Sequence, residues 1–100
     1  MSTNFNPGRL VMVDIPGKTL TPDEAAFLRE QGIRAVCLFR RNLGTEAEVR
    51  ALVSQLIEVM GPEALIGLDQ EGGGVVRATF LPLAPAAMAL GACGDEALAE

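Results

Sequence analysis

The stretch ALIGLDQEGGGVVR, residues 64–77, contains an apolar run that ends abruptly in three polar side chains. Residues 64–68 are continuously hydrophobic rather than alternating, which is typical of a strand buried on both faces of a sheet. Asp69, Gln70 and Glu71 follow this run directly, and three glycines come after them. Two acids and an amide at the end of a buried strand are costly unless something uses them. The stretch therefore predicts a buried strand whose end carries a polar site.

Two similar apolar runs lie upstream, at residues 10–15 and 33–39, and a helix is predicted after each of them. The first helix opens with the capping box TPDE, in which Thr21 is the cap and proline suits the first helical position. It extends to about residue 31 and stops at Gly32, because glycine is the usual residue just past a helix end.

The second predicted helix begins after the capping box TEAE at residues 45–48 and ends at Gly61. Its apolar stripe, which is expected to face the core, comprises Val49, Leu52, Val53, Leu56, Ile57 and Met60. Strands alternating with one-faced helices through short connections indicate parallel pairing and right-handed crossovers. The sequence therefore predicts an α/β fold, either an open doubly wound sheet or part of a barrel.

The last residues, 94–100, look like the first turn of a capped helix, which is too short to be stable alone. Three parallel strands also leave sheet edges that need partners. We therefore expect residues 1–100 to be the N-terminal portion of a larger domain. The alternative is a short standalone α/β module that binds a sugar or a partner without catalysis.

Bulk composition excludes several classes of function. The formal net charge is −5 and basic residues are not clustered, so a nucleic-acid partner is not expected. We also expect no membrane segment and no secretory signal, because the apolar runs are far shorter than the ~20 residues of a membrane helix. Cys37 and Cys93 lack metal-ligand or redox spacing, which favours a reduced, cytoplasmic protein. The 100 residues contain no histidine, so a Cys-His or Ser-His-Asp site and a His-based metal site are excluded here.

Ligands of parallel α/β folds bind at the carboxyl ends of the strands. The residues at these ends are Asp14, Arg40, Arg41, Asn42, Asp69, Gln70 and Glu71. The amino ends of the same strands carry no comparable cluster. This asymmetry predicts a polar ligand site at the carboxyl edge of the sheet.

Asp69 and Glu71 are candidates for a pair of carboxylates in glycoside hydrolysis, in which a retaining pair lies about 5–5.5 Å apart. Acids two residues apart are also common in loops, where Asp69 would be a cap and Glu71 the ion-pair partner of Arg40, Arg41 or Arg77. Spacing alone favours the cap and the ion pair over a pair of catalytic carboxylates. For Asp69, a role as acceptor of hydrogen bonds from sugar hydroxyls is also favoured over a catalytic role.

The other polar and apolar candidates have simpler interpretations. The glycines at 72–74 lack the spacing of a phosphate-binding loop, and a tight turn close to a ligand fits them better. Surface arginines such as Arg40 and Arg41 are usually solvated, and Asn42 is more often a turn former than a ligand. Cys37 is interpreted as a small buried hydrophobe, and Met88 as a packing residue.

Four segments together resemble glycoside hydrolase family 3, and specifically its bacterial β-N-acetylhexosaminidases of peptidoglycan recycling. These segments are LVMVD at 10–14, CLFRRN at 37–42, DQEGG at 69–73 with Val75 and Arg77, and PAAMALG at 85–91. The combination of DQEGG with the upstream FRRN is specific, and the four matches span nearly the whole chain after residue 9. One departure is Gly74, which stands where the family usually has arginine.

The resemblance implies a (β/α)8 TIM-type barrel, of which residues 1–100 would supply the first three strands and two helices. It also implies that terminal β-linked N-acetylglucosamine is released from a small carbohydrate substrate by retaining hydrolysis. No metal or other cofactor is implied. Asp69 would accept hydrogen bonds from the hydroxyls of the non-reducing sugar, and Arg77 would bind the same sugar. The nucleophilic aspartate and the histidine acid/base are implied beyond residue 100, so no catalytic residue is assigned within this chain.

Overall fold

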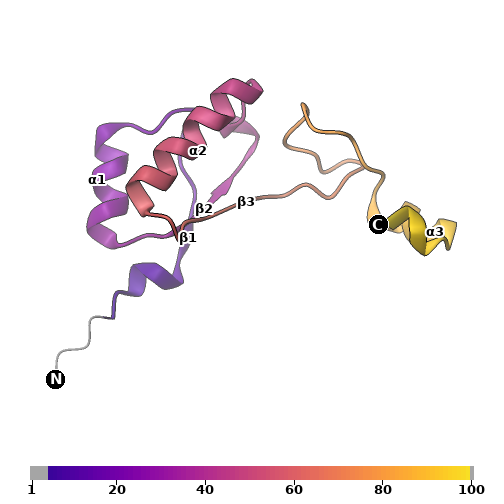
Figure 1. Ribbon diagram of the computed structural model, residues 1–100, viewed down its shortest axis with the longest axis horizontal. Coiled ribbons are helices and arrows are strands. Elements are labelled where there is room, and N and C mark those ends of the chain that lie inside the picture. Colours follow the sequence, from indigo (N-terminus) through magenta and orange to yellow (C-terminus); the bar gives the residue numbers. More distant parts are fainter. Residues whose placement is uncertain (1–4, 100) are drawn as a thin grey trace. The chain divides into compact units, whose positions relative to one another are not determined.

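The computed structural model describes residues 5–99 and divides into two units, one ending at Leu68 and the other beginning at Asp69 (Figure 1). The elements of the first unit are the 3-10 helix η1 (Pro7–Leu10), β1 (Met12–Val13), α1 (Pro22–Gln31), β2 (Ala35–Leu38), the 3-10 helix η2 (Arg40–Asn42), α2 (Glu46–Met60) and β3 (Leu65–Leu68). The three strands pair in the order β1-β2-β3, and both pairings are parallel. The predicted α/β class with parallel strands is therefore confirmed.

Both predicted capping boxes are present. The backbone N–H of Glu24 donates to Thr21 Oγ1 at 3.2 Å, and its carboxylate accepts from the Thr21 N–H at 2.9 Å. Thr45 and Glu48 repeat this arrangement with the same two distances at the start of α2. Gly32 ends α1 in the left-handed conformation, with φ of 66°. The helices consequently begin and end within a residue of where the sequence predicts.

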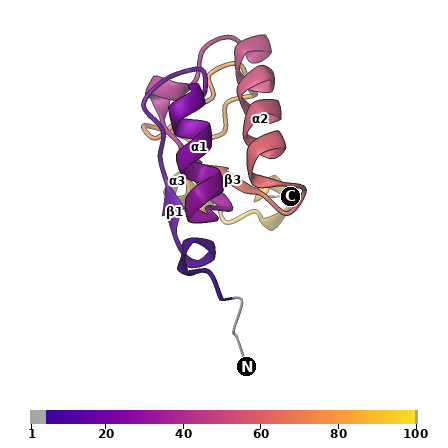
Figure 2. The ribbon, with the colours of Figure 1, turned by 90° about the vertical axis from the view of Figure 1, so that its left-hand side faces the viewer.

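The core of the first unit lies between the sheet and its two helices, α1 and α2, which lie side by side (Figure 2). Its fully buried side chains include Val36 and Leu38 from β2 and Leu52 and Leu56 from α2. Each such side chain contributes roughly 1.5–3 kcal/mol by leaving water. Ile57 belongs to the predicted apolar stripe but is 45% exposed, so the buried face of α2 is narrower than predicted.

The opposite face of the sheet is left exposed by residues 5–68, the described part of this unit. Met12 of β1 is 46% exposed and Leu65 of β3 is 62% exposed. Because successive strand residues point to opposite faces, the buried Val36 and Leu38 turn toward the helices while Ala35 and Cys37 turn toward this open face. Half-buried Cys37 is therefore less enclosed than predicted.

The first strand is much shorter than the predicted run at residues 10–15. The 3-10 helix η1 includes Leu10, the first residue of that run. Asn6 caps η1 by accepting a hydrogen bond from the Gly8 N–H at 2.9 Å, and Pro7 occupies the first position of η1. Leu10 lies at the end of this turn and is 76% exposed. Local turn chemistry therefore overrides the apolar pattern here.

The second unit contains α3 (Ala87–Cys93) and the 3-10 helix η3 (Glu96–Ala99), which follow a long loop. The helix predicted at 94–100 is thus a 3-10 turn, and residue 100 lies outside the described residues. Met88 is 86% exposed in this unit, so the packing role predicted for it is not seen. Within residues 5–99, no helix has the length and apolar character needed to cross a membrane.

Candidate functional site

The loop after β3 is held together by the side chain of Gln70. Its Oε1 accepts hydrogen bonds from the backbone N–H groups of Arg77 at 2.9 Å and Ala78 at 3.1 Å. Its Nε2 donates to the carbonyl oxygen of Ala78 at 3.2 Å. Ala78 is only 3% exposed, so two of these bonds satisfy the backbone groups of a buried residue, whereas the bond to the Arg77 N–H is exposed. A single amide therefore ties the start of the loop to a point eight residues further along.

A tight turn of glycines lies inside this loop. Gly72 and Val75 form an isolated antiparallel bridge, in which the Gly72 N–H donates to the Val75 carbonyl at 3.1 Å and the Val75 N–H donates to the Gly72 carbonyl at 3.1 Å. Gly72 has φ of 83° and Gly73 has φ of 57°, and residues other than glycine rarely adopt this conformation. The predicted tight turn at the glycine run is confirmed.

Asp69 and Arg77, the two predicted sugar-binding residues, flank this loop. Asp69 is exposed and Arg77 is half-buried. Across residues 5–99, neither side chain forms a hydrogen bond or an ion pair, although the backbone N–H of Arg77 is held by Gln70. The alternative role of Asp69 as a loop cap is therefore not supported. Both charged groups are available to a ligand.

Glu71 forms no ion pair within the described residues of its own unit. Its side chain is exposed, and it does not pair with Arg77. Its backbone N–H donates to the Val75 carbonyl at 2.9 Å, which adds to the glycine turn. The salt bridge between Glu71 and Arg77 is therefore not seen, and a salt bridge to Arg40 or Arg41 stays a prediction.

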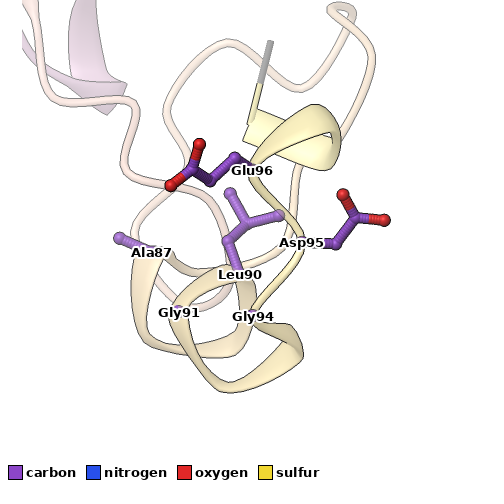
Figure 3. Close-up of a pocket in the computed structure, with 6 residues that line it drawn as sticks. All are labelled: Ala87, Leu90, Gly91, Gly94, Asp95 and Glu96. Atoms are coloured by element: carbon purple, nitrogen blue, oxygen red, sulfur yellow. The ribbon is translucent and has the colours of Figure 1, made fainter.

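The second unit also contains a cavity of about 480 Å³ between α3 and η3 (Figure 3). Its lining residues are Ala87, Leu90, Gly91, Gly94, Asp95 and Glu96. The carboxylates of Asp95 and Glu96 point to opposite sides of Leu90, so they do not converge on one point (Figure 3). The cavity is apolar with acids at its rim, and neither Asp69 nor Arg77 lines it.

A second cluster of predicted site residues lies in the first unit. The Arg41 guanidinium pairs with the Asp14 carboxylate, donates to the Ile15 carbonyl at 3.3 Å and lies 5.0 Å from the centre of the Phe39 ring. Arg41 is thus a surface arginine as predicted, with a side chain that is 47% exposed, and it also contacts three neighbours. Asp14, in turn, has its charge balanced within the cluster.

Asn42 is the buried member of this cluster, at 1% exposure. Its Oδ1 accepts from the Phe39 N–H at 2.8 Å, and its Nδ2 donates to the carbonyls of Ile15 and Gly17, each at 2.8 Å. The asparagine therefore joins the end of β2 to the connection that follows β1. Its predicted role as a turn former is confirmed, and its side chain also forms two long-range hydrogen bonds, to Ile15 and Gly17.

A cavity of about 500 Å³ opens beside this cluster on the uncovered face of the sheet. It is lined by Met12, Val13, Asp14, Cys37 and Phe39, so its only charged lining group is a carboxylate that already pairs with Arg41. Nowhere in residues 5–99 do three or more His, Cys, Asp or Glu side chains come together as a metal site. That the carboxyl ends of all three strands form one ligand site stays a prediction.

The proteins similar to this chain include β-hexosaminidases of several bacteria. A β-hexosaminidase of Chromobacterium violaceum is 43% identical over 67 residues, which cover 67% of this chain and 19% of that protein. A β-hexosaminidase of Methylococcus capsulatus is 37% identical over 90 residues, which cover 88% of this chain and 27% of that protein. No protein-family model matches the sequence.

Solved structures with a similar fold include two glycoside hydrolases. A glycoside hydrolase family 3 β-N-acetylglucosaminidase from Paenibacillus sp. str. FPU-7 matches with a TM-score of 0.85 and 35% identity, over 94% of this chain and 19% of that one. NagZ from Neisseria gonorrhoeae in complex with N-trifluoroacetyl-D-glucosamine matches with a TM-score of 0.79 and 32% identity, over 88% of this chain and 27% of that one. The chain spans about a fifth to a quarter of the length of these relatives.

Proposed function

Because this chain belongs to glycoside hydrolase family 3, we propose that it is the sugar-binding first portion of a β-N-acetylhexosaminidase. The complete protein would hydrolyse terminal β-linked N-acetylglucosamine with retention of configuration, on peptidoglycan fragments in the cytoplasm. Its nucleophile and its acid/base would lie beyond residue 100, in agreement with the fraction of the relatives that the chain spans. Neither a metal nor another cofactor takes part in this proposal.

The open face of the sheet supports a barrel. Met12 and Leu65 leave large apolar side chains exposed on the face opposite the helices. In a (β/α)8 barrel this face is the interior, where side chains from successive strands fill the core in layers. We propose that residues 1–100 are the N-terminal portion of a single barrel domain and that further strands cover these side chains.

The observation that carries the sugar-binding role is the state of Asp69 and Arg77. Their charged groups have no partner among residues 5–99, although the loop that bears them is fixed by three hydrogen bonds of Gln70. A carboxylate accepts hydroxyl donors and a guanidinium donates to oxygen acceptors, and such charge-assisted bonds are the stronger kind. A pyranose offers both kinds of partner on one ring.

The test is hydrolysis of a chromogenic β-N-acetylglucosaminide by the complete protein. Each hydrogen bond that Asp69 accepts from the sugar is worth about 1.5–3 kcal/mol, so Asp69→Ala should weaken binding by at least about 10-fold. Asp95→Asn, which changes another exposed carboxylate of the same unit, should leave KM near the wild-type value. Wild-type affinity in Asp69→Ala would refute the assigned role.

Two other outcomes separate the alternatives. A loss of kcat by orders of magnitude in both Asp69→Ala and Glu71→Gln would indicate that the two acids form a catalytic pair. Binding of N-acetylglucosamine by the complete protein, with no turnover of any glycoside, would indicate a binding module without catalysis.

A further inference from the structure

We infer that Gln70 is the positioning residue of the proposed sugar site, acting on the sugar through Arg77 rather than by contact. The inference rests on the proposed function, because it assigns to Gln70 the task of holding a sugar-binding residue in place. Gln70 follows Asp69 directly in the chain, and its carboxamide binds the backbone N–H of Arg77 itself at 2.9 Å. One predicted sugar-binding residue is therefore next to Gln70 in the chain, and the backbone of the other is hydrogen-bonded to the Gln70 carboxamide.

The three hydrogen bonds need a carboxamide at this distance from the backbone. Oε1 uses both of its lone pairs on the N–H groups of residues 77 and 78, while Nε2 donates to the carbonyl of residue 78. A glutamate side chain has no N–H donor, and a methionine side chain has no N–H donor and only a weak sulfur acceptor. An asparagine side chain is one methylene shorter. Because Oε1 is fully used inside the loop, this side chain is poorly placed to recognise a sugar hydroxyl as an acceptor.

The stretch between Gln70 and residue 77 is flexible by composition. Between Gln70 and Arg77 lie three consecutive glycines, which lose more conformational freedom on ordering than any other residue. The turn at residues 72–75 is closed by the bridge between Gly72 and Val75 and is joined to Ala84 through the Gly73 N–H, so these bonds hold the glycines and not residue 77. Without the amide of Gln70, Arg77 would sample many positions relative to Asp69. Only the fraction of molecules with both groups in place would bind the sugar, and the apparent affinity would fall by that fraction.

The experiment compares variants of the complete protein by steady-state kinetics on the chromogenic substrate and by calorimetric binding of N-acetylglucosamine. Gln70→Met keeps the size of the side chain and removes all three bonds, so KM and Kd should rise by about 10-fold to 100-fold while kcat changes by less than about threefold. Gln70→Glu keeps the acceptor and loses the donor, and its effect should be intermediate.

Gln55→Met is the matched control, because Gln55 also accepts a long-range backbone hydrogen bond, from the Leu20 N–H at 3.2 Å. This bond lies in the first unit and touches no predicted site residue. Gln55→Met should therefore lower the urea midpoint and leave KM unchanged. A rise in KM in both variants would mean that loss of stability, and not positioning, explains the effect.

A double-mutant cycle decides how Gln70 acts. In the Arg77→Ala background, Gln70→Met should add little, because the residue that it positions is already gone. Full additivity of the two substitutions would overturn the inference, since it would mean that Gln70 contacts the sugar independently. Amide hydrogen exchange at residues 77 and 78 should be faster in Gln70→Met than in the wild type, and it can be followed even where activity is too low to measure.

The outcomes separate this inference from the proposed function. A wild-type protein that neither binds N-acetylglucosamine nor hydrolyses the substrate refutes the proposed function. A wild-type protein that does both, together with an unchanged KM in Gln70→Met, overturns the positioning role alone.

Discussion

Two glycines of one turn, Gly72 and Gly74, should respond in opposite ways to the same substitution. Gly72 has φ of 83°, and an added Cβ would lie 2.5 Å from the Pro85 carbonyl oxygen and 2.6 Å from that of Ala84. Gly74 has no positive φ, and an added Cβ would meet nothing within 4 Å. The two positions are close in the chain, so each serves as the control for the other.

The expected magnitudes follow from these geometries. Alanine at position 72 costs roughly 1–2 kcal/mol for the left-handed conformation. The clash with two backbone carbonyls, which cannot rotate away as a side chain would, adds about 1–3 kcal/mol. Gly74→Ala should stabilise the loop by about 0.4–1 kcal/mol, because it restricts the unfolded chain and strains nothing. The difference between the variants should therefore exceed about 2 kcal/mol.

The assay is urea unfolding of the complete protein, together with amide hydrogen exchange at Gly73, whose N–H donates to the Ala84 carbonyl at 3.2 Å. Exchange should accelerate in Gly72→Ala and stay slow in Gly74→Ala. Gly74→Arg, which restores the residue usual in the family, should be tolerated as well as Gly74→Ala. Equal destabilisation by Gly72→Ala and Gly74→Ala would refute the reasoning.

Two further predictions concern the first unit. Asn42→Ala removes three hydrogen bonds at a site that is 1% exposed: it leaves the Phe39 N–H and the Gly17 carbonyl without this partner, and the Ile15 carbonyl with its bond from Arg41. This substitution should cost roughly 3 kcal/mol in urea unfolding, whereas Asn6→Ala removes one capping bond and should cost about 1 kcal/mol. Equal losses would contradict this explanation. Hydrogen bonds from the backbone and then the hydroxyl of Thr45 hold the pKa of Glu48 below its ordinary value of 4.5. Because the pKa is lower in the folded state, the resulting stability is present above pH 4.5 and is lost as the pH falls through the folded-state value. In Glu48→Gln, the urea midpoint should fall less steeply as the pH is lowered than it does in the wild type. An identical fall in both proteins would exclude the capping carboxylate as the cause.

Features encoded by a few neighbouring residues could be predicted from the sequence. The boxes that start at Thr21 and Thr45 involve partners three residues apart, so the sequence displays both ends of each hydrogen bond. The glycine that ends α1 is equally local. These signals, with the continuous hydrophobicity of the strands, are sufficient for α1, α2, the parallel pairing and the α/β class, but not for α3, which was not predicted.

Features that depend on distant partners could not be predicted in the same way. Asn42 binds carbonyls 25 and 27 residues earlier, and Arg41 binds Asp14 across 27 residues, so neither partner is visible in the local sequence. The prediction that Ile57 belongs to the buried face of α2 is wrong for a related reason. Periodicity gives the direction of a buried helix face, but the packing of neighbouring elements decides how wide that face is. The resemblance that assigned Asp69 and Arg77 gave no role to the residue between Asp69 and Glu71.

The polar triplet at the end of β3 contains residues in three different states, and the difference between them is informative. Gln70 satisfies its hydrogen-bonding groups inside the loop, and the backbone of Glu71 belongs to the glycine turn. Asp69 has an exposed carboxylate that no group within residues 5–99 approaches as a donor. Folding of this segment therefore accounts for the amide but not for the acid beside it. A ligand that accounts for Asp69 must bring hydrogen-bond donors, as the hydroxyls of a sugar do, and it must bind beside the loop that Gln70 holds.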